Sequence, residues 1–149
     1  MTNFAQDSDL LEYEPQIRDY GIHDYSDLHT KTTTDIERLL NIRWWNTHQA
    51  SNTDITVIGT ATKLTKSKLN HNQFTRAAVY HVLAYYIFPR LSTFTEEQDV
   101  FERKMNYYKE KFAEEFDLIL RDGVHYDADS SGTYEDTEKQ SFFHGRLIR

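Results

Sequence analysis

The chain has 149 residues, of which 38% are hydrophobic and 14% aromatic, and its formal net charge is −7. This length and apolar content predict one domain with its own core. Because cysteine is absent, disulfides, thiolate zinc sites and cysteine nucleophiles are excluded, and assembly inside a cell is the simplest expectation. No apolar run has the length of a signal peptide or a membrane span, so we expect a soluble protein without membrane contacts.

The first half of the chain predicts two helices and a long loop. Pro15 and Gly21 are placed to begin and to stop a short helix. Apolar residues then recur at helical spacing over residues 27–46, with Ser26 as the N-cap. Residues 48–72 are rich in Thr, Ser and Asn and predict a loop or hairpin, in which "DITVIG" is the best strand candidate.

The middle of the chain predicts a buried central helix. It starts at Asn70, where Asn70 and Gln73 approach the pattern of a capping box. Apolar residues then occupy nearly every side through Phe88, as in a helix surrounded by other elements. Pro89 should disturb or end this helix.

The next segment predicts a long amphipathic helix over residues 96–121. Thr95 and Gln98 form a capping box, and apolar residues follow at intervals of three and four. Gly123 provides the stop. The fold class is therefore mainly α: a small helical bundle with this long helix, a Thr/Lys-rich loop or hairpin, and an extended C-terminal arm. We divide the chain into a helical domain, residues 1–123, and an acidic loop with an arm, residues 124–149.

Charge is unevenly distributed along the chain. Residues 55–95 contain no acid and five bases, whereas residues 122–138 contain six acids and no base. Such sorting suits surfaces that meet oppositely charged copies or partners. A solvated loop and a solvated tail that differ in sign would give the same pattern.

Catalytic signatures are missing from the sequence. The seven histidines form no H-E-x-x-H pattern, there is no G-x-S-x-G, and five scattered glycines make no phosphate-binding loop. His81 is the histidine that we expect to be buried, as a satisfied core residue and not as a base or ligand. We therefore expect no enzymatic activity and no required cofactor.

Three lysines precede the central helix: Lys63, Lys66 and Lys68. They could contact phosphate groups near a helix N-terminus. Without interleaved aromatic residues, a solvated loop is the favoured interpretation.

Aromatic residues occur as adjacent pairs: Trp44–Trp45, Tyr85–Tyr86, Tyr107–Tyr108 and Phe142–Phe143. Neighbours on a helix diverge by about 100°, so one core face cannot take both rings. We expect one ring of each helical pair to meet a second surface, as at protein interfaces. A large core with half-exposed tyrosines is the alternative.

The stretch "DADSSGTYEDTE" follows the ligand order of a calcium loop. Positions 1, 3, 5, 7, 9 and 12 of the EF-hand pattern fall on Asp127, Asp129, Ser131, Thr133, Glu135 and Glu138. Gly132 stands at position 6, where the pattern needs a sharp turn. The sequence has no flanking helix pair and no second loop, so a solvated acidic turn closed by Gly132 is the alternative to a Ca²⁺ site.

Several segments together resemble the head-to-tail connector (adaptor, or head completion) proteins of tailed bacteriophages. They are "LLEYEPQIRDYGIHDYSD", "TTDIERLLNIRWW", "QFTRAAVYHVLAYYIFP", "FERKMNYYKEKFAEEF" and the end "YDADSSGTYEDTEK...GRLIR". The resemblance extends over most of the chain and consists of packing patterns and turns without a catalytic motif.

The resemblance implies a virion structural protein located in the neck and assembled in the host cytoplasm. Its subunits would form a closed, dodecameric ring that binds the portal protein and tail or neck proteins. DNA would pass through the ring without sequence-specific binding. In such a ring, Phe142 and Phe143 would anchor the arm on a neighbour, and Arg146 and Arg149 would pair with acids.

Two other functions remain as alternatives. The first is a calcium-binding protein-interaction module based on the acidic loop. The second is a hydrolase or nuclease, which a pocket with clustered carboxylate and histidine groups would favour.

Overall fold

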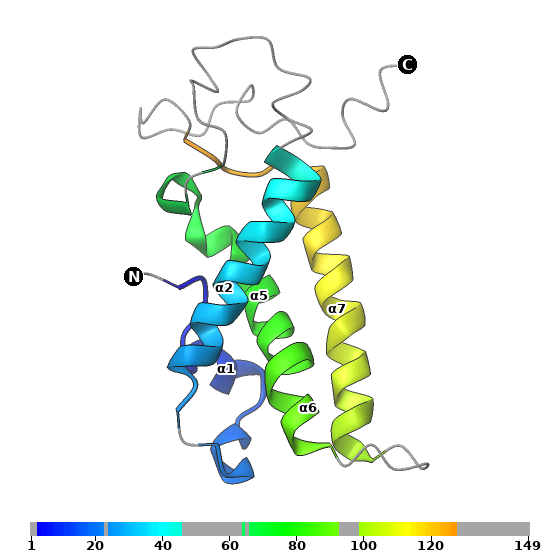
Figure 1. The fold of residues 1–149 in the computed structure, drawn as a ribbon. Helices are drawn as coiled ribbons and strands as arrows, with labels where there is room; N and C mark the ends of the chain where they lie inside the picture. Colours follow the sequence, from blue (N-terminus) through cyan, green and yellow to red (C-terminus); the bar gives the residue numbers. More distant parts are fainter. Residues whose placement is uncertain (1–2, 23, 46–63, 65, 93–98, 128–149) are drawn as a thin grey trace. The chain divides into compact units, whose positions relative to one another are not determined.

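The computed structural model describes residues 3–22, 24–45, 64, 66–92 and 99–127. Helices take up 79% of these residues, so the protein is a small, mainly α bundle, as predicted. In chain order the elements are α1 (Asp7–Tyr13), a 3-10 helix (Ile17–Tyr20), α2 (Ser26–Leu40), a π-helical turn (Asn41–Trp45), a 3-10 turn (Lys66–Lys68), α5 (His71–Val82), a second π-helical turn (Leu83–Ile87), α6 (Phe88–Leu91) and α7 (Val100–Asp122) (Figure 1).

Contacts between residues divide the chain into two compact units. Unit 1 comprises Met1–Thr34 and Phe74–Phe116, and unit 2 comprises Asp35–Gln73 and Asp117–Arg149. The strand candidate at residues 54–59, most of the predicted loop at residues 48–72 and the C-terminal arm lie outside the described residues. The proposed boundary between residues 123 and 124 therefore stays a prediction. In the described part of the chain, no helix is long and apolar enough to cross a membrane.

The N-terminal region contains one helix that the sequence did not predict. This helix, α1, starts where the backbone N–H of Gln6 donates to Oδ2 of Asp9 at 2.8 Å. The predicted short helix after Pro15 is confirmed as the 3-10 helix, and it ends at Gly21, whose φ of 87° lies in the left-handed region. Glycine tolerates that conformation, so Gly21 terminates the helix as expected.

The predicted helix over residues 27–46 is confirmed, with two local differences. The cap comes from Asp24 instead of Ser26: one carboxylate oxygen of Asp24 accepts from the backbone N–H and the hydroxyl of Ser26 at 2.9 and 2.8 Å. These bonds to the Ser26 backbone and side chain lower the pKa of Asp24. After Leu40 the helix widens into the π-helical turn.

The central helix is confirmed, and near Pro89 it is disturbed, as predicted, without ending there. The α-helical hydrogen bonding of α5 gives way to the π-helical turn, and α6 then restarts with Pro89 in its first turn. Backbone N–H groups in a first turn have no partner within the helix, so proline costs little there. The helical path therefore continues to Leu91.

The long helix α7 begins four residues later than predicted. The carboxylate of Asp99 caps it by accepting from the backbone N–H of Glu102 at 2.7 Å. The predicted capping residues, Thr95 and Gln98, lie outside the described residues. At the other end the helix stops at Gly123 as expected, with φ at 104°.

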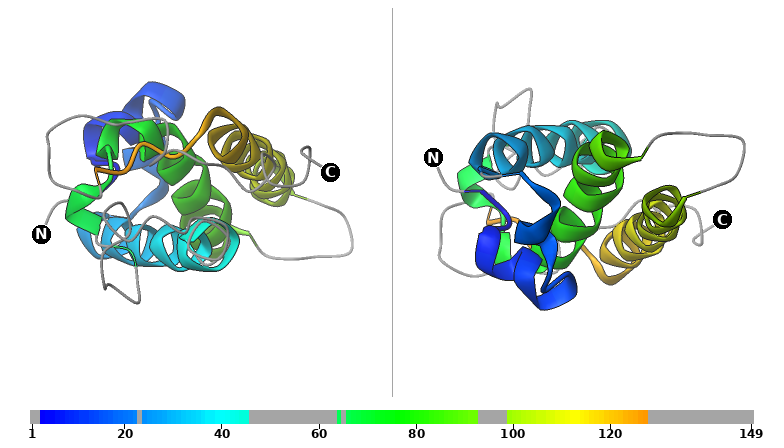
Figure 2. Two further views of the ribbon diagram at one scale, coloured as in Figure 1. Left: turned by 90° about the horizontal axis from the view of Figure 1, so that it is seen from above. Right: turned by 90° about the horizontal axis from the view of Figure 1, so that it is seen from below.

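The core of unit 1 is largely aromatic. Within this unit α5 lies beside α1 and α7, as the two views of Figure 2 show. Tyr80 of α5 contacts Tyr13 of α1 and Tyr108 of α7, with ring centroids 5.5 and 5.9 Å apart. Phe88 stacks on Tyr108 at 5.8 Å. Contacts of this kind explain part of the aromatic excess as ordinary core packing.

In unit 2, backbone pairing and one glutamine side chain join residues 69–73 to the segment that follows α7. Leu69 and Tyr126 form an isolated antiparallel bridge. The amide of Gln73 donates to the carbonyl of Gly123 at 3.0 Å and accepts from the backbone N–H of His125 at 2.9 Å. Gln73 therefore does not complete the predicted capping box with Asn70, because its side chain holds the segment that follows α7.

Three covered tyrosines of unit 1 predict a loss of stability in alkali: Tyr25 and Tyr108 are buried and Tyr80 is half-buried. Loss of contact with water raises the pKa of each phenol above its usual value. The second cause is the negative charge of a neighbour, which is Asp7 for Tyr25, Tyr13 for Tyr80 and Glu14 for Tyr108. Above about pH 10 the unfolded chain loses phenol protons that the folded chain keeps, so the free energy of unfolding should fall as pH rises. Urea unfolding between about pH 8 and pH 11 would measure this fall.

The variant Tyr108→Phe removes one of the three phenols and should make the decline with pH shallower. A free energy of unfolding that stays constant or rises up to about pH 11 would contradict the expectation.

Candidate functional site

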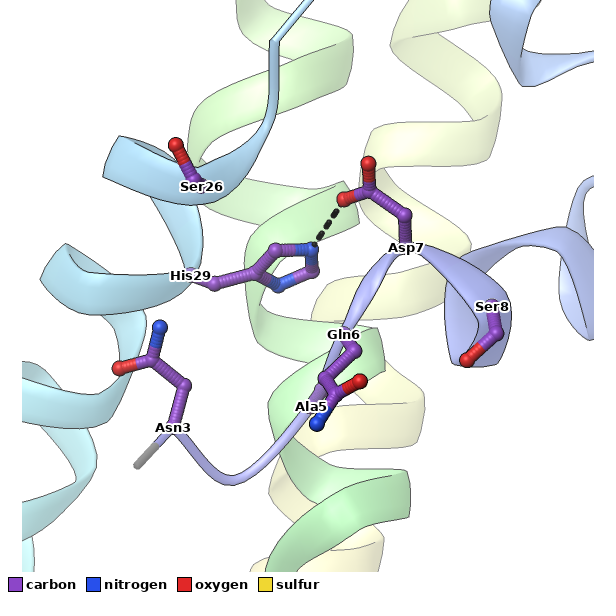
Figure 3. Close-up of a pocket in the computed structure, with 7 residues that line it drawn as sticks. All are labelled: Asn3, Ala5, Gln6, Asp7, Ser8, Ser26 and His29. Atoms are coloured by element: carbon purple, nitrogen blue, oxygen red, sulfur yellow. Dashed lines mark hydrogen bonds and ion pairs between the residues drawn. The ribbon is translucent and has the colours of Figure 1, made fainter. Parts of the chain in front are cut away.

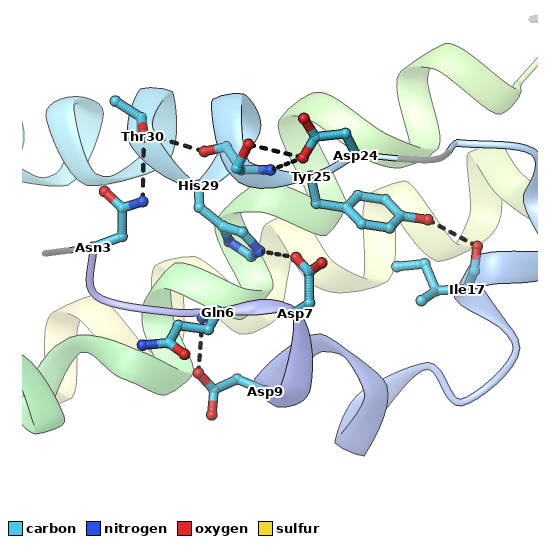
Figure 4. A network of polar contacts seen from close by, with 10 residues as sticks. Asn3, Gln6, Asp7, Asp9, Ile17, Asp24, Tyr25, His29 and Thr30 are labelled. Atoms are coloured by element: carbon cyan, nitrogen blue, oxygen red, sulfur yellow. Dashed lines mark hydrogen bonds and ion pairs between the residues drawn. The ribbon is translucent and has the colours of Figure 1, made fainter. Parts of the chain in front are cut away.

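The N-terminal segment is attached to α2 and α5 by a series of polar contacts, of which Figure 4 shows those from Asn3 to Thr30 and from Asp7 to His29 on α2. The amide of Asn3 donates to the hydroxyl of Thr30 at 3.3 Å, and the backbone N–H of Phe4 donates to the hydroxyl of Thr33 at 3.2 Å. Thr75 of α5 donates to the carbonyl of Phe4 at 2.8 Å. Both backbone and side chains therefore fix the position of this segment within unit 1.

An Asp–His pair lies at the end of this segment. Nε2 of His29 on α2 is 3.0 Å from Oδ1 of Asp7, the first residue of α1. The side chain of His29 is 4% exposed, whereas that of Asp7 is 42% exposed. A carboxylate only accepts hydrogen bonds, so the contact assigns a proton to Nε2 of the imidazole.

The pair borders a pocket of about 410 Å³. Figure 3 shows its lining, which comes from the N-terminal segment, the start of α1 and the start of α2: Asn3, Ala5, Gln6, Asp7, Ser8, Ser26 and His29. Ligand pockets in proteins have volumes of about 300–1,000 Å³. The pocket is therefore large enough for a small molecule or for one side chain of a partner.

The second ring nitrogen of His29 determines what the pair can do chemically. Nδ1 is buried and has no hydrogen-bond partner among the described residues. In a Ser–His–Asp triad the aspartate binds Nδ1 and the nucleophile donates to Nε2, whereas in this pair Asp7 already contacts Nε2 and Nδ1 is the nitrogen left over. Here the hydroxyl of Ser26 instead donates to Asp24, so the geometry provides a hydrogen-bond acceptor and no activated serine.

His29 was missed in the sequence, because His81 was expected to be the one buried histidine. His81 is indeed buried, at 6% exposure, and its Nδ1 lies 3.3 Å from the hydroxyl of Thr32. The available signal for His29 was its helical spacing with Thr33, Ile36 and Leu40, all of which are buried. Asp7 gave no local signal, since it is 22 residues away in sequence.

The expectation that one ring of each helical pair is left at a surface is wrong for Trp44 and Trp45. Both residues are buried, at 0% and 1% exposure. Their rings lie 5.6 and 5.4 Å from the ring of Tyr126, which both tryptophans contact. Because the ring of Tyr126 contacts both, both tryptophan side chains belong to the core of unit 2.

The two tyrosine pairs of unit 1 differ from the tryptophans. Tyr107 is 54% exposed and Tyr108 is 7% exposed, and Tyr85 is 45% exposed beside a half-buried Tyr86. Lys109 and Lys111 place their ammonium groups 5.5 Å from the ring centroids of Tyr85 and Tyr107. Tyrosine is enriched at protein interfaces, whereas lysine is depleted there, so the two exposed rings and not the lysines indicate a contact surface.

The predicted calcium loop is described only at its first position. The backbone N–H of Asp127 donates to the carbonyl of Lys68 at 2.9 Å, which fixes the chain in unit 2 just before the loop. The other predicted ligands and the predicted arm residues lie outside the described residues: Asp129, Ser131, Thr133, Glu135, Glu138, Phe142, Phe143, Arg146 and Arg149. The calcium site and the arm contacts stay predictions.

The lysine-rich stretch is partly structured. Lys66 and Lys68 are half-buried and belong to the 3-10 turn, and the carbonyl of Lys66 accepts from the backbone N–H of Leu69 at 3.1 Å. Lys63 lies outside the described residues. The turn gives these two lysines more order than a solvated loop would.

No protein-family model matches the chain, and comparisons with curated proteins and with solved structures gave no significant match.

Proposed function

We propose that the chain is a structural subunit of a bacteriophage virion, which joins the head to the tail as part of a closed ring. In this proposal the ring binds the portal, extends the DNA channel and offers a surface for tail or neck proteins. Its location would be the neck of the virion, and assembly would take place in the host cytoplasm. The subunit would have no catalytic role.

The exposed tyrosines of unit 1 carry the proposal in structural terms. Tyr85 and Tyr107 leave about half of their surface uncovered, although the aromatic core beside them is tightly packed. Tyrosine is enriched at the buried centres of protein interfaces, because it combines a large apolar ring with a polar hydroxyl group. The resemblance of the helical segments to connector proteins supplies the kind of partner, and the sorted charges suit a ring of unlike faces.

Native mass spectrometry of the full-length chain tests the proposal. We expect a ring of about twelve copies, alone or after addition of the portal protein, because heterologous contacts close when the rotation between copies allows it. The double variant Tyr85→Ala, Tyr107→Ala should lower the ring fraction at least about tenfold. Unchanged circular dichroism would show that the variant still folds.

A matched control uses Glu114→Gln, which alters an exposed group of α7 without removing an aromatic ring. Its ring fraction should equal that of the wild type within about twofold, since exposed ion pairs contribute little. A monomeric wild-type mass, both alone and with the portal protein, would contradict the proposal.

A calcium-dependent interaction module is the second candidate. It is favoured by the hydrogen bond from the backbone N–H of Asp127 to the carbonyl of Lys68. This bond holds the residue at the first ligand position of the acidic loop in place. The same mass measurement separates the candidates: one calcium per chain, lost in Glu138→Gln, would favour the module, whereas rings that persist in a chelator would favour the connector.

A further inference from the structure

We propose that the pocket between the N-terminal segment and α2 binds a cationic group with N–H donors, that is, a primary ammonium or a guanidinium. None of the pocket residues has a part in the proposed ring. The pocket would therefore be a separate binding site, and it can exist whether or not the chain forms a ring.

The buried histidine supplies the first reason. Asp7 accepts from Nε2 of His29, and in the tautomer that this contact assigns the lone pair is on Nδ1. This atom is buried and has no partner among the described residues. Figure 3 shows it on the side of the ring that faces the pocket between Asn3 and Gln6. A buried acceptor without a donor costs free energy, and a bound N–H group would remove that cost.

The charge around the pocket supplies the second reason. Among its seven lining residues Asp7 is the one acid, and none is a lysine or arginine. Two further carboxylates touch lining residues: Asp9 accepts from the backbone N–H of Gln6, and Asp24 accepts from Ser26. On α2, Lys31 is paired with Asp27 at 3.4 Å. These carboxylates favour a cation in the pocket and oppose an anion.

Other ligand classes fit less well. A metal ion usually takes three or four protein ligands, and the described residues contain no group of three His, Cys, Asp or Glu side chains that could hold one. A neutral amide could donate to Nδ1 but would gain less from the carboxylate of Asp7. An ammonium or guanidinium can donate to Nδ1, and its positive charge is favoured by the carboxylates around the pocket.

Two sources could provide this chemistry, namely a free amine or guanidine, or a lysine or arginine side chain of another polypeptide. Calorimetric titration of the full-length protein separates them with three probes: ethylguanidine, the peptide acetyl-Gly-Arg-Gly-amide, and the same peptide with citrulline in place of arginine. Citrulline matches arginine in shape and lacks its charge.

We expect the arginine peptide to bind at least about tenfold more tightly than the citrulline peptide. The variant Asp7→Asn should remove at least about tenfold of that affinity. The matched control Glu114→Gln changes net charge by the same amount outside the pocket, and its affinity should stay within about twofold of the wild type. Tighter binding of the peptide than of ethylguanidine points to a protein side chain, and equal binding points to a free small molecule.

A second variant guards against an effect of Asp7→Asn on folding. Ser8 is exposed at the pocket and leaves the Asp7–His29 pair untouched, so Ser8→Trp should block the pocket while the urea midpoint stays unchanged. Arginine-peptide binding that survives in Ser8→Trp would overturn the proposal. So would equal affinity for the arginine and citrulline peptides, or the absence of any binding at about 10 mM probe, where an ordered water on Nδ1 would be the sole occupant.

Discussion

Replacing Trp44 with alanine is expected to lower the free energy of unfolding by about 3–5 kcal/mol, the range for deleting a large buried aromatic ring. Trp44 is fully buried and contacts the rings of Trp45 and Tyr126, 5.9 and 5.6 Å away. Its loss would leave a cavity between two remaining rings that the helical backbone cannot close. Since domains of this size have about 5–15 kcal/mol in total, the variant should be marginally stable.

Urea unfolding followed by circular dichroism would measure this loss. The matched control is Ile42→Ala in the same π-helical turn, because Ile42 is 59% exposed and its truncation should change the free energy of unfolding by less than about 0.5 kcal/mol. If Trp44→Ala lowers the free energy of unfolding by less than about 1 kcal/mol, Trp44 is not a core residue, and the interface role predicted from the sequence would be favoured instead.

Replacing Glu14 with glutamine is expected to lower the free energy of unfolding by about 2–3 kcal/mol. Glu14 is 8% exposed. Its carboxylate accepts from Nζ of Lys104 at 3.2 and 3.0 Å and from the hydroxyl of Tyr108 at 3.0 Å. An amide keeps the shape but removes the negative charge, so the partly buried ammonium of Lys104 loses its counter-ion. Lys104 keeps some access to water, which holds the expected loss near the lower end.

A double-mutant cycle with Lys104→Met would isolate the pair and should give a coupling free energy of about 1–2 kcal/mol. The control pair Lys111–Glu114, 3.6 Å apart and exposed on α7, should give less than about 0.5 kcal/mol. Equal coupling for the two pairs would show that burial adds nothing to the contact of Glu14.

Periodic sequence patterns predicted the long helices but not every end of them. α1 was not predicted, because it has only seven residues and one of them, Leu10, is buried. One buried position cannot display the 3.6-residue hydrophobic period of a helix. At the start of α7 two capping patterns compete, Thr95 with Gln98 and Asp99 with Glu102, and the described helix uses the second. Which pattern wins depends on tertiary contacts that local spacing does not encode.

The candidate site depended even more on tertiary structure. Asp7 and His29 come from different helices, and no spacing rule links them. The aromatic pairs gave a divided result. The argument from helical spacing holds for Tyr107 and Tyr108 in the regular helix α7, and Tyr85 is exposed beside a half-buried Tyr86 in a π-helical turn. It fails for Trp44 and Trp45, because the ring of Tyr126, a residue distant in sequence, contacts both of them.

The π-helical turn between α5 and α6 also bears on how this chain tolerates a change of length. A π-turn holds one residue more than the α-helical turn it replaces, because its hydrogen bonds reach from residue i to i+5. The helical phase of α5 therefore does not carry over to α6. Removing one residue within Leu83–Ile87 would restore the α-helical ladder while the flanking helices keep their packing faces. A one-residue deletion should thus be absorbed in this turn, whereas in the middle of α7 it would rotate every later side chain off its contacts.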